Sequence, residues 1–188
     1  MISKKYLILT LLLAVAAFTR LFPHPMNFAP IGAMALASGA YLGRNVWGFL
    51  APLGIYWISD LLVNNILYAE FYNSFILFTP GFGWLYLSFA MIIVLGSILL
   101  SKISIPRVLG GALGASVLFY IISNFGVWLS DPDYPLTWGG LLLCYEMAIP
   151  FFRGTLASDL MYSAAFFGIM EWVRHSSSTL SWDEKLVE

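Results

Sequence analysis

The stretch Arg20–Gly43 reads RLFPHPMNFAPIGAMALASGAYLG, and its two halves differ sharply in composition. Three prolines surround a histidine and an asparagine in the first half, whereas the second half consists mostly of small and apolar residues. Proline removes a backbone donor and restricts the residue before it, so the first half predicts a loop and the second a short helix. Apolar segments flank the stretch on both sides, so the structure and the role that we expect for it depend on whether the chain lies in water or in lipid.

The composition identifies that solvent as a membrane. The 188 residues are 60% hydrophobic and only 10% charged, and the mean hydropathy is +0.84. Soluble domains carry roughly a quarter charged residues, which this chain lacks. The aromatic content of 17% fits, because Trp and Tyr gather where membrane meets water. We therefore expect an all-α, polytopic integral membrane protein.

Six apolar segments are candidate spans, since about 20 apolar residues are needed to cross ~30 Å of hydrocarbon. The second is short and would be tilted or deeply seated. The lysines before the first, with Ala14 and Ala16 after them, would also fit a signal peptide, but we expect a retained helix. The fold class predicted is a six-helix transmembrane bundle, with spans at Tyr6–Phe22, Phe28–Gly43, Val46–Tyr68, Phe82–Leu100, Val108–Leu129 and Gly154–Val173.

The basic residues indicate the orientation of these spans. With six spans and both termini in the cytoplasm, the outer side keeps only Arg153 and the membrane-edge Arg20. Basic residues favour the cytoplasmic side, so this arrangement is the expected one. The basic residues that it places inside are Lys4, Lys5, Arg44, Lys102, Arg107, Arg174 and Lys185.

The outer connections are longer than the inner ones. They cover Pro23–Asn27, Ala69–Gly81 and Ser130–Arg153. Within the last, Trp138–Ile149 is apolar but too short to span, and Pro150 follows it. We therefore expect a short helix on the outer face before the last span. The whole forms a single membrane domain, residues 1–173, followed by a polar cytoplasmic tail, residues 174–188.

Small residues recur at every fourth position in two spans. They are Ala35, Gly39 and Gly43 in the second, and Gly110 and Gly114 in the fifth. Such ridges let helix backbones approach closely in lipid. They would serve packing within the protein or docking to a partner membrane protein.

Charged and polar residues within the spans are the candidates for function. An ionised residue at mid-membrane costs roughly 2.5–3.5 kcal/mol, so such groups must be paired or hydrated. Arg20 and Arg153 would neutralise Asp60 and Asp159 as structural pairs, or the same groups would line a polar cavity open to the outside. The ligand-binding candidates are Arg20, His24, Asn27, Asp60, Asn64, Asn124, Trp128, Tyr134, Arg153 and Asp159.

The sequence lacks the motifs that several classes of function require. The single cysteine, Cys144, rules out an internal disulfide or a paired-cysteine metal site, and no hydrolase, metalloprotease or nucleotide-binding signature is present. A net charge of −1 without a basic run argues against nucleic-acid binding. We expect no metal, no cofactor and no catalytic residue.

Three runs of sequence resemble a family of small bacterial six-span membrane proteins. They are RLFPHPMNFAPIGAMAL, the later SNFGVWL, and YEMAIPFFRGTLASDLMYSAAFFG. That family is in turn similar to the substrate-binding S-components of energy-coupling factor vitamin transporters. The resemblance implies a bundle in the bacterial cytoplasmic (inner) membrane that captures a vitamin-like molecule outside and is driven by an ATPase–scaffold module. In a cobalamin-specific group a cysteine lies near the third outer segment, but Ala69–Gly81 contains none, which argues against cobalamin.

The function expected is therefore a substrate-binding transport subunit in the bilayer, with a vitamin-like or cofactor-precursor molecule as its ligand. One alternative is a small membrane enzyme acting on a lipid or isoprenoid headgroup, with Asp60 or Asp159 as acid or base beside His24. The other is a structural or assembly protein whose polar residues only hold the bundle together. A cavity of several hundred Å³ at the outer ends of the helices would favour the first.

Overall fold

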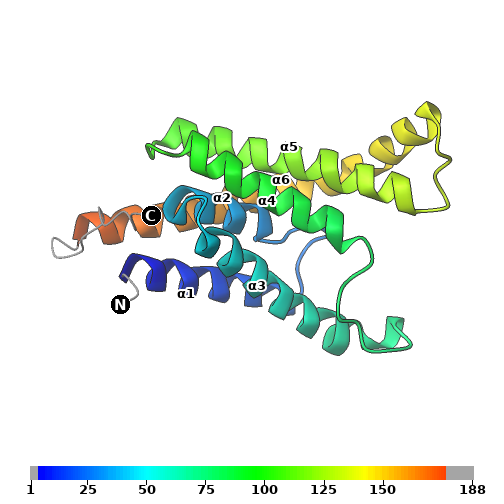
Figure 1. Cartoon of the computed structure of the whole chain (residues 1–188), viewed down its shortest axis with the longest axis horizontal. Helices are drawn as coiled ribbons and strands as arrows, with labels where there is room; N and C mark the ends of the chain where they lie inside the picture. The colour runs from blue at the N-terminus through cyan, green and yellow to red at the C-terminus, as the bar shows by residue number, and fades with distance from the viewer. Residues whose placement is uncertain (1–3, 177–188) are drawn as a thin grey trace.

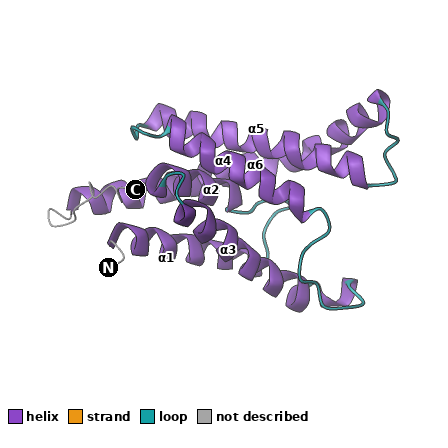
Figure 2. Ribbon diagram, viewed as in Figure 1, coloured by secondary structure: helices purple, strands orange, loops and turns teal. Residues whose placement is uncertain are grey.

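The computed structural model describes residues 4–176, and this part of the chain is built from helices without strands (Figures 1 and 2). A 3₁₀ turn, η1, extends α1, and a π-helical turn, η2, extends α3. The bounds are α1 Lys4–Phe18, η1 Thr19–Leu21, α2 Ile31–Leu42, α3 Val46–Leu62, η2 Val63–Leu67, η3 Ala69–Phe71, α4 Phe82–Leu99, α5 Ile105–Ser130 and α6 Trp138–Ser176.

Successive long helices run in alternating directions along the long axis (Figure 1). The α1–α2, α3–α4 and α5–α6 connections therefore gather at one end, which we call the loop end. The shorter α2–α3 and α4–α5 connections lie at the other end, together with the C-terminal part of α6 (Figure 1). Arg44 and Lys102 belong to these shorter connections. The alternation agrees with the order of elements expected from the sequence.

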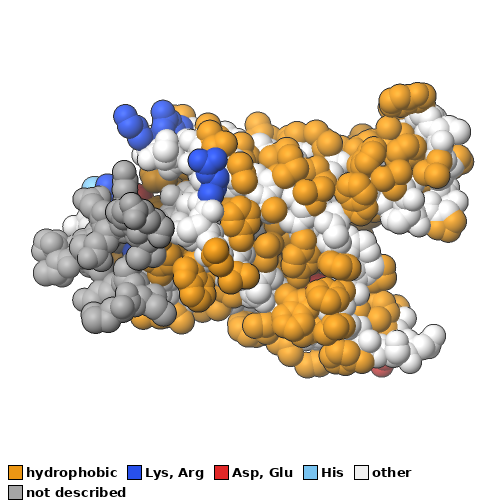
Figure 3. Space-filling view, in the orientation of Figure 1, with side chains coloured by type: hydrophobic (Ala, Val, Ile, Leu, Met, Phe, Trp, Pro, Cys, Tyr) orange, Lys and Arg blue, Asp and Glu red, His pale blue; other side chains and the backbone are white. Residues whose placement is uncertain are grey.

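Three helical segments are long and apolar enough to cross a membrane: Val46–Leu67, Phe82–Leu99 and Ile105–Ser130. The sides of the bundle carry large exposed apolar side chains, which cover much of the face in Figure 3. Leu109, Leu113 and Val117 repeat along α5 at four-residue spacing and are 38–51% exposed. A water-soluble surface rarely presents so much contiguous apolar area. The protein is therefore a helical membrane-associated protein.

Helix α2 forms the centre of the bundle. It packs against all five of the other long helices, and every residue from Gly32 to Gly39 is buried. Small side chains make this possible, because alanine and glycine let neighbouring backbones approach closely. The short second segment of the sequence is thus a core helix around which the longer ones are arranged.

Two glycines set the distance between α2 and α4. A Cβ on Gly39 would collide with the Ile93 carbonyl, and one on Gly96 with the Leu36 carbonyl. Ala35 is also buried, so Ala35 and Gly39 serve internal packing and are unavailable to a partner. Gly43 ends α2 with a φ of 75°, which favours glycine. Of the five residues considered for docking, Gly110 is exposed. Gly114 lies close to α4, since a Cβ added to Gly114 would be 3.2 Å from the Leu95 side chain.

The expected short helix Trp138–Ile149 is not separate from the last span. One helix, α6, runs from Trp138 to Ser176 with Pro150 inside it, so the expectation that Pro150 would end a helix is wrong. Side chains brace its first part against α5: the Tyr120 hydroxyl donates to the Tyr145 carbonyl at 2.5 Å, and the Tyr145 hydroxyl donates to the Ile121 carbonyl at 2.7 Å. Contacts of this kind hold a helix across a proline that removes one backbone bond.

The far end of α6 also differs from the prediction. Arg174 and His175 form its last turn, whereas the sequence placed them in a polar tail. Basic side chains there interact favourably with the negative end of the helix dipole, which accounts for the extension. The remainder of the predicted tail, residues 177–188, lies outside the described residues.

Candidate functional site

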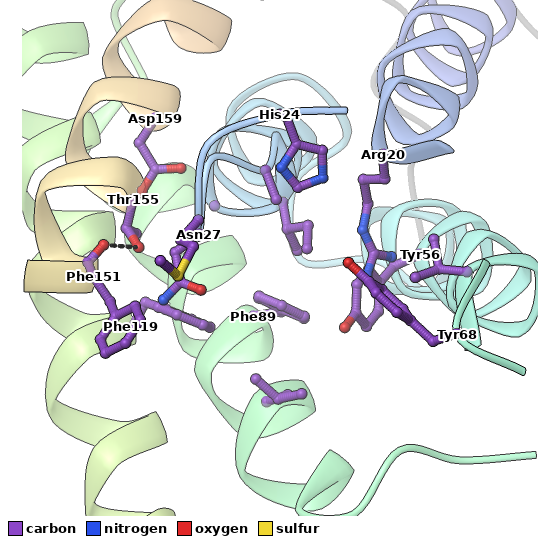
Figure 4. A pocket seen from close by; sticks show the side chains of 16 residues that line it. Arg20, His24, Asn27, Tyr56, Tyr68, Phe89, Phe119, Phe151, Thr155 and Asp159 are labelled. Carbon is purple, nitrogen blue, oxygen red and sulfur yellow. Dashed lines mark hydrogen bonds between the residues drawn. The ribbon is translucent and has the colours of Figure 1, made fainter. Parts of the chain in front are cut away.

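A cavity of about 410 Å³ lies between the helices and the α1–α2 loop, toward the loop end (Figure 4). Its polar wall comes from η1, that loop and α6, and aromatic side chains form much of the rest. Its volume is in the usual range for small-molecule sites. The residues that line it are Arg20, His24, Met26, Asn27, Ala29, Ile31, Gly32, Tyr56, Val63, Tyr68, Leu85, Phe89, Phe119, Phe151, Thr155 and Asp159.

The proline-rich loop forms one wall because its backbone cannot continue either helix. Asn27 has a φ of 55°, in the left-handed region that asparagine tolerates better than most residues. His24 is exposed, and its Nδ1 donates to the Pro25 carbonyl at 2.9 Å. The neutral ring then has Nε2 available as an acceptor. The loop is tied to α6 through the Ser158 hydroxyl, which donates to the Ala29 carbonyl at 3.0 Å.

Arg20 is the cationic side chain of the cavity, and it is already well partnered. Its guanidinium donates to Asp60 at 2.9 Å and to the Ser59 hydroxyl at 2.8 Å. It also lies 4.6 Å from the centre of the Tyr56 ring, a cation–π distance. Only 12% of the Arg20 side chain and 14% of the Asp60 side chain are exposed. The predicted pairing of Arg20 with Asp60 is therefore present.

Asp60 connects this pair to the α3–α4 connection. The Asn64 amide donates to Asp60 at 3.1 Å, and the Thr79 hydroxyl donates to the same carboxylate oxygen. Asn65 exchanges two hydrogen bonds with the backbone of Ile76. These bonds explain the π-helical turn η2, since side-chain pairing to a loop compensates for its irregular backbone. Asp60 and Asn64 thus stand behind Arg20 and do not line the cavity.

Asp159 lies across the cavity from Arg20 (Figure 4) and has a different environment. Its carboxylate accepts the Ala33 amide at 3.0 Å and the Ser116 hydroxyl at 2.7 Å, and 1% of the residue is exposed. It thereby satisfies a free amide in the first turn of α2, where the helix dipole favours negative charge. Gly32 makes this contact possible, because a Cβ there would overlap the carboxylate.

The predicted pairing of Asp159 with Arg153 is absent. Within residues 4–176 the ion pairs are Arg20–Asp60 and Arg174–Glu171, and Arg153 is exposed. The reason is helical geometry: six positions separate Arg153 from Asp159, so they do not share the face that residues three or four apart share. Asp159 is a buried carboxylate without a cationic partner in the described part of the chain.

Three further candidates also lie outside the cavity, as Arg153 does. The Asn124 amide donates to the Tyr120 carbonyl in its own helix, at 2.7 Å. The Trp128 indole donates to the Pro135 carbonyl at 2.9 Å, and Tyr134 belongs to the same α5–α6 connection. The sequence placed these residues near the loop end, but helix α5 turns Asn124 and Trp128 toward α6 and its connection. Their placement in the cavity wall is corrected.

The aromatic wall was not foreseen from the sequence. Phe89 of α4 and Phe119 of α5 stack with ring centres 5.9 Å apart and planes at 5°, and Phe151 and Tyr68 lie nearby (Figure 4). The only signal for these residues in the sequence was their spacing from the two aspartates. Tyr56 lies four residues before Asp60 on α3, and Phe151 and Thr155 lie eight and four residues before Asp159 on α6, so each set shares one helix face. Phe89 and Phe119 carry no such signal, because phenylalanine is common throughout apolar helices.

A second groove, also of about 410 Å³, lies between the start of α5 and the C-terminal half of α6. It is mainly apolar, with Glu171 and His175 toward one end. The Glu171 carboxylate accepts the Tyr41 hydroxyl at 2.9 Å and pairs with Arg174 at 3.4 Å. The Ser163 hydroxyl, which also borders the groove, has no partner within the described chain.

The described residues contain no group of three or more metal-binding side chains. Cys144 is buried, and its thiol contacts the Asn124 carbonyl at 3.4 Å. Cys144 therefore serves as a small buried side chain between α5 and α6. The wall of the first cavity presents hydrogen-bonding groups, one carboxylate, one paired guanidinium and several aromatic faces. These groups are suited to holding a small molecule.

Comparison with known proteins gives one result. No curated protein and no solved structure matches the chain. One protein family does match, over residues 1–180, and it is described as a family of unknown function, DUF6580. The match covers almost the entire chain, so the protein belongs to the DUF6580 family.

Proposed function

We propose that this protein is an integral membrane substrate-binding subunit for transport, and that it captures a small molecule from the outer face. The observation that carries the proposal is the cavity of about 410 Å³, which lies toward the loop end and joins polar and aromatic walls. Sites for small molecules are typically concave and mostly apolar, with a few convergent polar groups that orient the ligand.

The proposal includes six spans with both termini in the cytoplasm. Six alternating helices return the chain to the side on which it began, and α1 and α6 would join the three candidate spans and the short α2. The α2–α3 and α4–α5 connections carry Arg44 and Lys102, whereas the loop-end connections carry Glu70, Asp131 and Asp133. Basic residues favour the cytoplasmic side, so the cavity would face outward.

The energy source would be a partner protein or an ion gradient, because the sequence has no nucleotide-binding motif. An ATPase–scaffold module of the kind that drives S-components remains the proposed partner. The exposed Gly110, with Leu109 and Leu113 on the same helix, offers a surface near the cytoplasmic end where another helix would pack closely.

The enzyme alternative has less support. It needs His24 beside Asp60 or Asp159, and each of these groups is already hydrogen-bonded elsewhere: Asp60 to Arg20 and Asn64, Asp159 to Ala33 and Ser116, and His24 to Pro25. Arg20, which pairs with Asp60, lies across the cavity from Asp159 (Figure 4). A general acid–base pair acts most readily when its two groups are positioned together, and within residues 4–176 no hydrogen bond joins His24 to Asp60 or to Asp159.

The proposal is tested by identifying what the cavity holds. The protein is purified in a mild detergent, denatured, and the released small molecules are analysed by mass spectrometry. The Ala29→Trp variant places an indole in the cavity wall and should lose the ligand. The Leu109→Trp variant, at an exposed apolar position, should retain it.

Both variants are checked for folding by thermal unfolding before the comparison. Equal recovery of every small molecule from the wild type and the Ala29→Trp variant would refute the proposal. So would the absence of any stoichiometric small molecule after the wild type has been incubated with a bacterial extract.

A further inference from the structure

We infer that the ligand of the cavity is an organic cation, with its positive nitrogen directed toward Asp159 and a flat ring-bearing body against the aromatic wall. This inference rests on the proposed function, because it takes the cavity as the binding site. It adds the chemical class of the ligand, which the composition and the motifs of the sequence leave open.

The first argument is the balance of charge around the cavity. Arg20 is neutralised by Asp60 at 2.9 Å, so the pair contributes no net charge to the wall. Asp159, on the opposite side, has no cationic partner within residues 4–176. His24 lies between them in the close-up and is exposed to solvent (Figure 4). With the carboxylate ionised and the His24 ring neutral, the cavity wall carries one uncompensated negative charge.

The second argument is the cost of that arrangement. A buried carboxylate is stable when it is paired or fully hydrogen-bonded, and an unpaired charge in a membrane protein marks a functional group by default. Asp159 receives two hydrogen bonds, from the Ala33 amide and the Ser116 hydroxyl. A carboxylate accepts about four, so acceptor capacity remains for a third donor. A cationic ligand would supply both the missing charge and the missing donor.

The third argument is the shape and chemistry of the wall on the Asp159 side. Phe119 and Phe151 lie on the same side of the cavity as Thr155 and Asp159 (Figure 4), and Phe119 stacks parallel to Phe89 with a centroid distance of 5.9 Å. Phe151 precedes Asp159 by about two turns of α6, so its ring lies about 12 Å along the helix from the carboxylate. Aromatic faces attract cations, and stacked rings accommodate flat ones. The combination of a carboxylate with several rings is suited to an organic ammonium ion.

The same features disfavour the other charge classes. An anionic ligand would add a second uncompensated negative charge beside Asp159, because the donors of Arg20 already face Asp60 and Ser59. Like charges that share a site repel strongly in a low-dielectric interior. A bare metal ion would leave most of a cavity of about 410 Å³ empty and its aromatic wall without a purpose.

The inference is tested with three probes that share an indole ring and a short side chain but differ in charge: tryptamine, tryptophol and indole-3-acetate. Their affinities are measured by isothermal titration calorimetry on the full-length protein in detergent. The cation, tryptamine, is expected to bind at least about tenfold more tightly than the neutral and anionic probes, a factor that corresponds to about 1.4 kcal/mol. This comparison uses the wild type alone, so it does not depend on any variant folding.

Two matched variants locate the preference. Asp159→Asn keeps an oxygen that accepts the Ala33 amide but removes the charge, and it should abolish the preference for tryptamine. Asp60→Asn releases Arg20 from its partner, and it should shift the preference toward indole-3-acetate. Gly54→Ala, which faces open space on α3, should leave the ranking unchanged.

Equal binding of all three probes, a preference for the anion, or no tryptamine binding would overturn the inference. So would competition by sodium but not potassium, which would indicate a metal-ion site. If a ligand still co-purifies with the wild type and is lost in the Ala29→Trp variant, the proposed function stands and only the ligand class is wrong.

Discussion

The role of a charged side chain in this protein depends on its local partners, as a comparison of Arg20, Asp60 and Asp159 shows. Arg20 and Asp60 satisfy each other at 2.9 Å, and Ser59, Asn64 and Thr79 complete their network. Asp159 relies on a backbone amide and a hydroxyl instead. The first group is therefore a structural pair of which only Arg20 borders the cavity, and Asp159 is the residue whose charge is left for a ligand.

The Arg20–Asp60 pair should behave as a coupled unit in stability measurements. Arg20→Met leaves a largely buried carboxylate unpaired, and breaking such a pair costs about 3 kcal/mol. The double variant Arg20→Met with Asp60→Asn should lose less than the sum of the two single losses, by about 1 kcal/mol or more. Reversible unfolding of the detergent-solubilised protein by sodium dodecyl sulfate, followed by circular dichroism, measures all three variants.

Arg174→Gln is the matched control for this set of single and double variants. Its pair with Glu171 spans 3.4 Å, and 51% of the Arg174 side chain is exposed, so the loss should be below about 1 kcal/mol. If the losses of unfolding free energy in the Arg20 and Asp60 single variants add up to the loss in the double variant, the two side chains act independently. That result would contradict the structural interpretation.

At the scale of elements, α2 is the feature on which the others depend. It is short, small in side-chain volume and buried, and its first turn is capped from α6 by Asp159. The loop before it lines the cavity. The same element therefore sets the packing of the bundle and the position of the candidate site, and a change in α2 should affect both.

Gly39→Ala should destabilise the protein because its methyl group would meet the Ile93 carbonyl of α4. Overpacking of this kind typically costs about 1–3 kcal/mol. The Gly54→Ala variant, with open space at the same position, should unfold at or above the temperature of the wild type. Thermal unfolding in detergent distinguishes the two variants. Indistinguishable unfolding temperatures would mean that α2 and α4 separate at little cost.

At the scale of the whole molecule, the charges and connections divide the bundle into two unlike ends. Figure 3 shows Lys and Arg side chains at the left end, and a hollow between two lobes at the right end. The apolar sides between these ends carry exposed side chains such as Leu7, Leu11 and Val15, which are 54–68% exposed. This arrangement suits a molecule that crosses a bilayer with its cavity directed to one side.

The proposed orientation predicts which connections are accessible from outside. In a Cys144→Ala background, the Asp133→Cys variant should react with a membrane-impermeant maleimide in intact spheroplasts. The Lys102→Cys variant should react only after lysis, because the α4–α5 connection would face the cytoplasm. Labelling of both variants in intact spheroplasts, or of Lys102→Cys alone, would contradict the six-span orientation.

The sequence by itself determined the class of the protein and the positions of its helices. Composition requires an apolar environment, and apolar segment length places α3, α4 and α5 within a few residues of their observed bounds. The sequence also identified Arg20, His24, Asn27 and Asp159 as residues of one polar site, and all four line the cavity. These features follow from local properties: hydrophobicity, charge, and the backbone restrictions of proline.

Only the tertiary structure decided which side chains meet. Helix α6 continues through Pro150 because α5 braces it, and the direction in which α5 faces takes Asn124 and Trp128 away from the cavity. Helices distant in sequence pack together so that Arg20 pairs with Asp60, whereas none of the cations among residues 4–176 pairs with Asp159. Sequence spacing orders residues along one helix, but the rotation of each helix about its axis is set by packing against its neighbours.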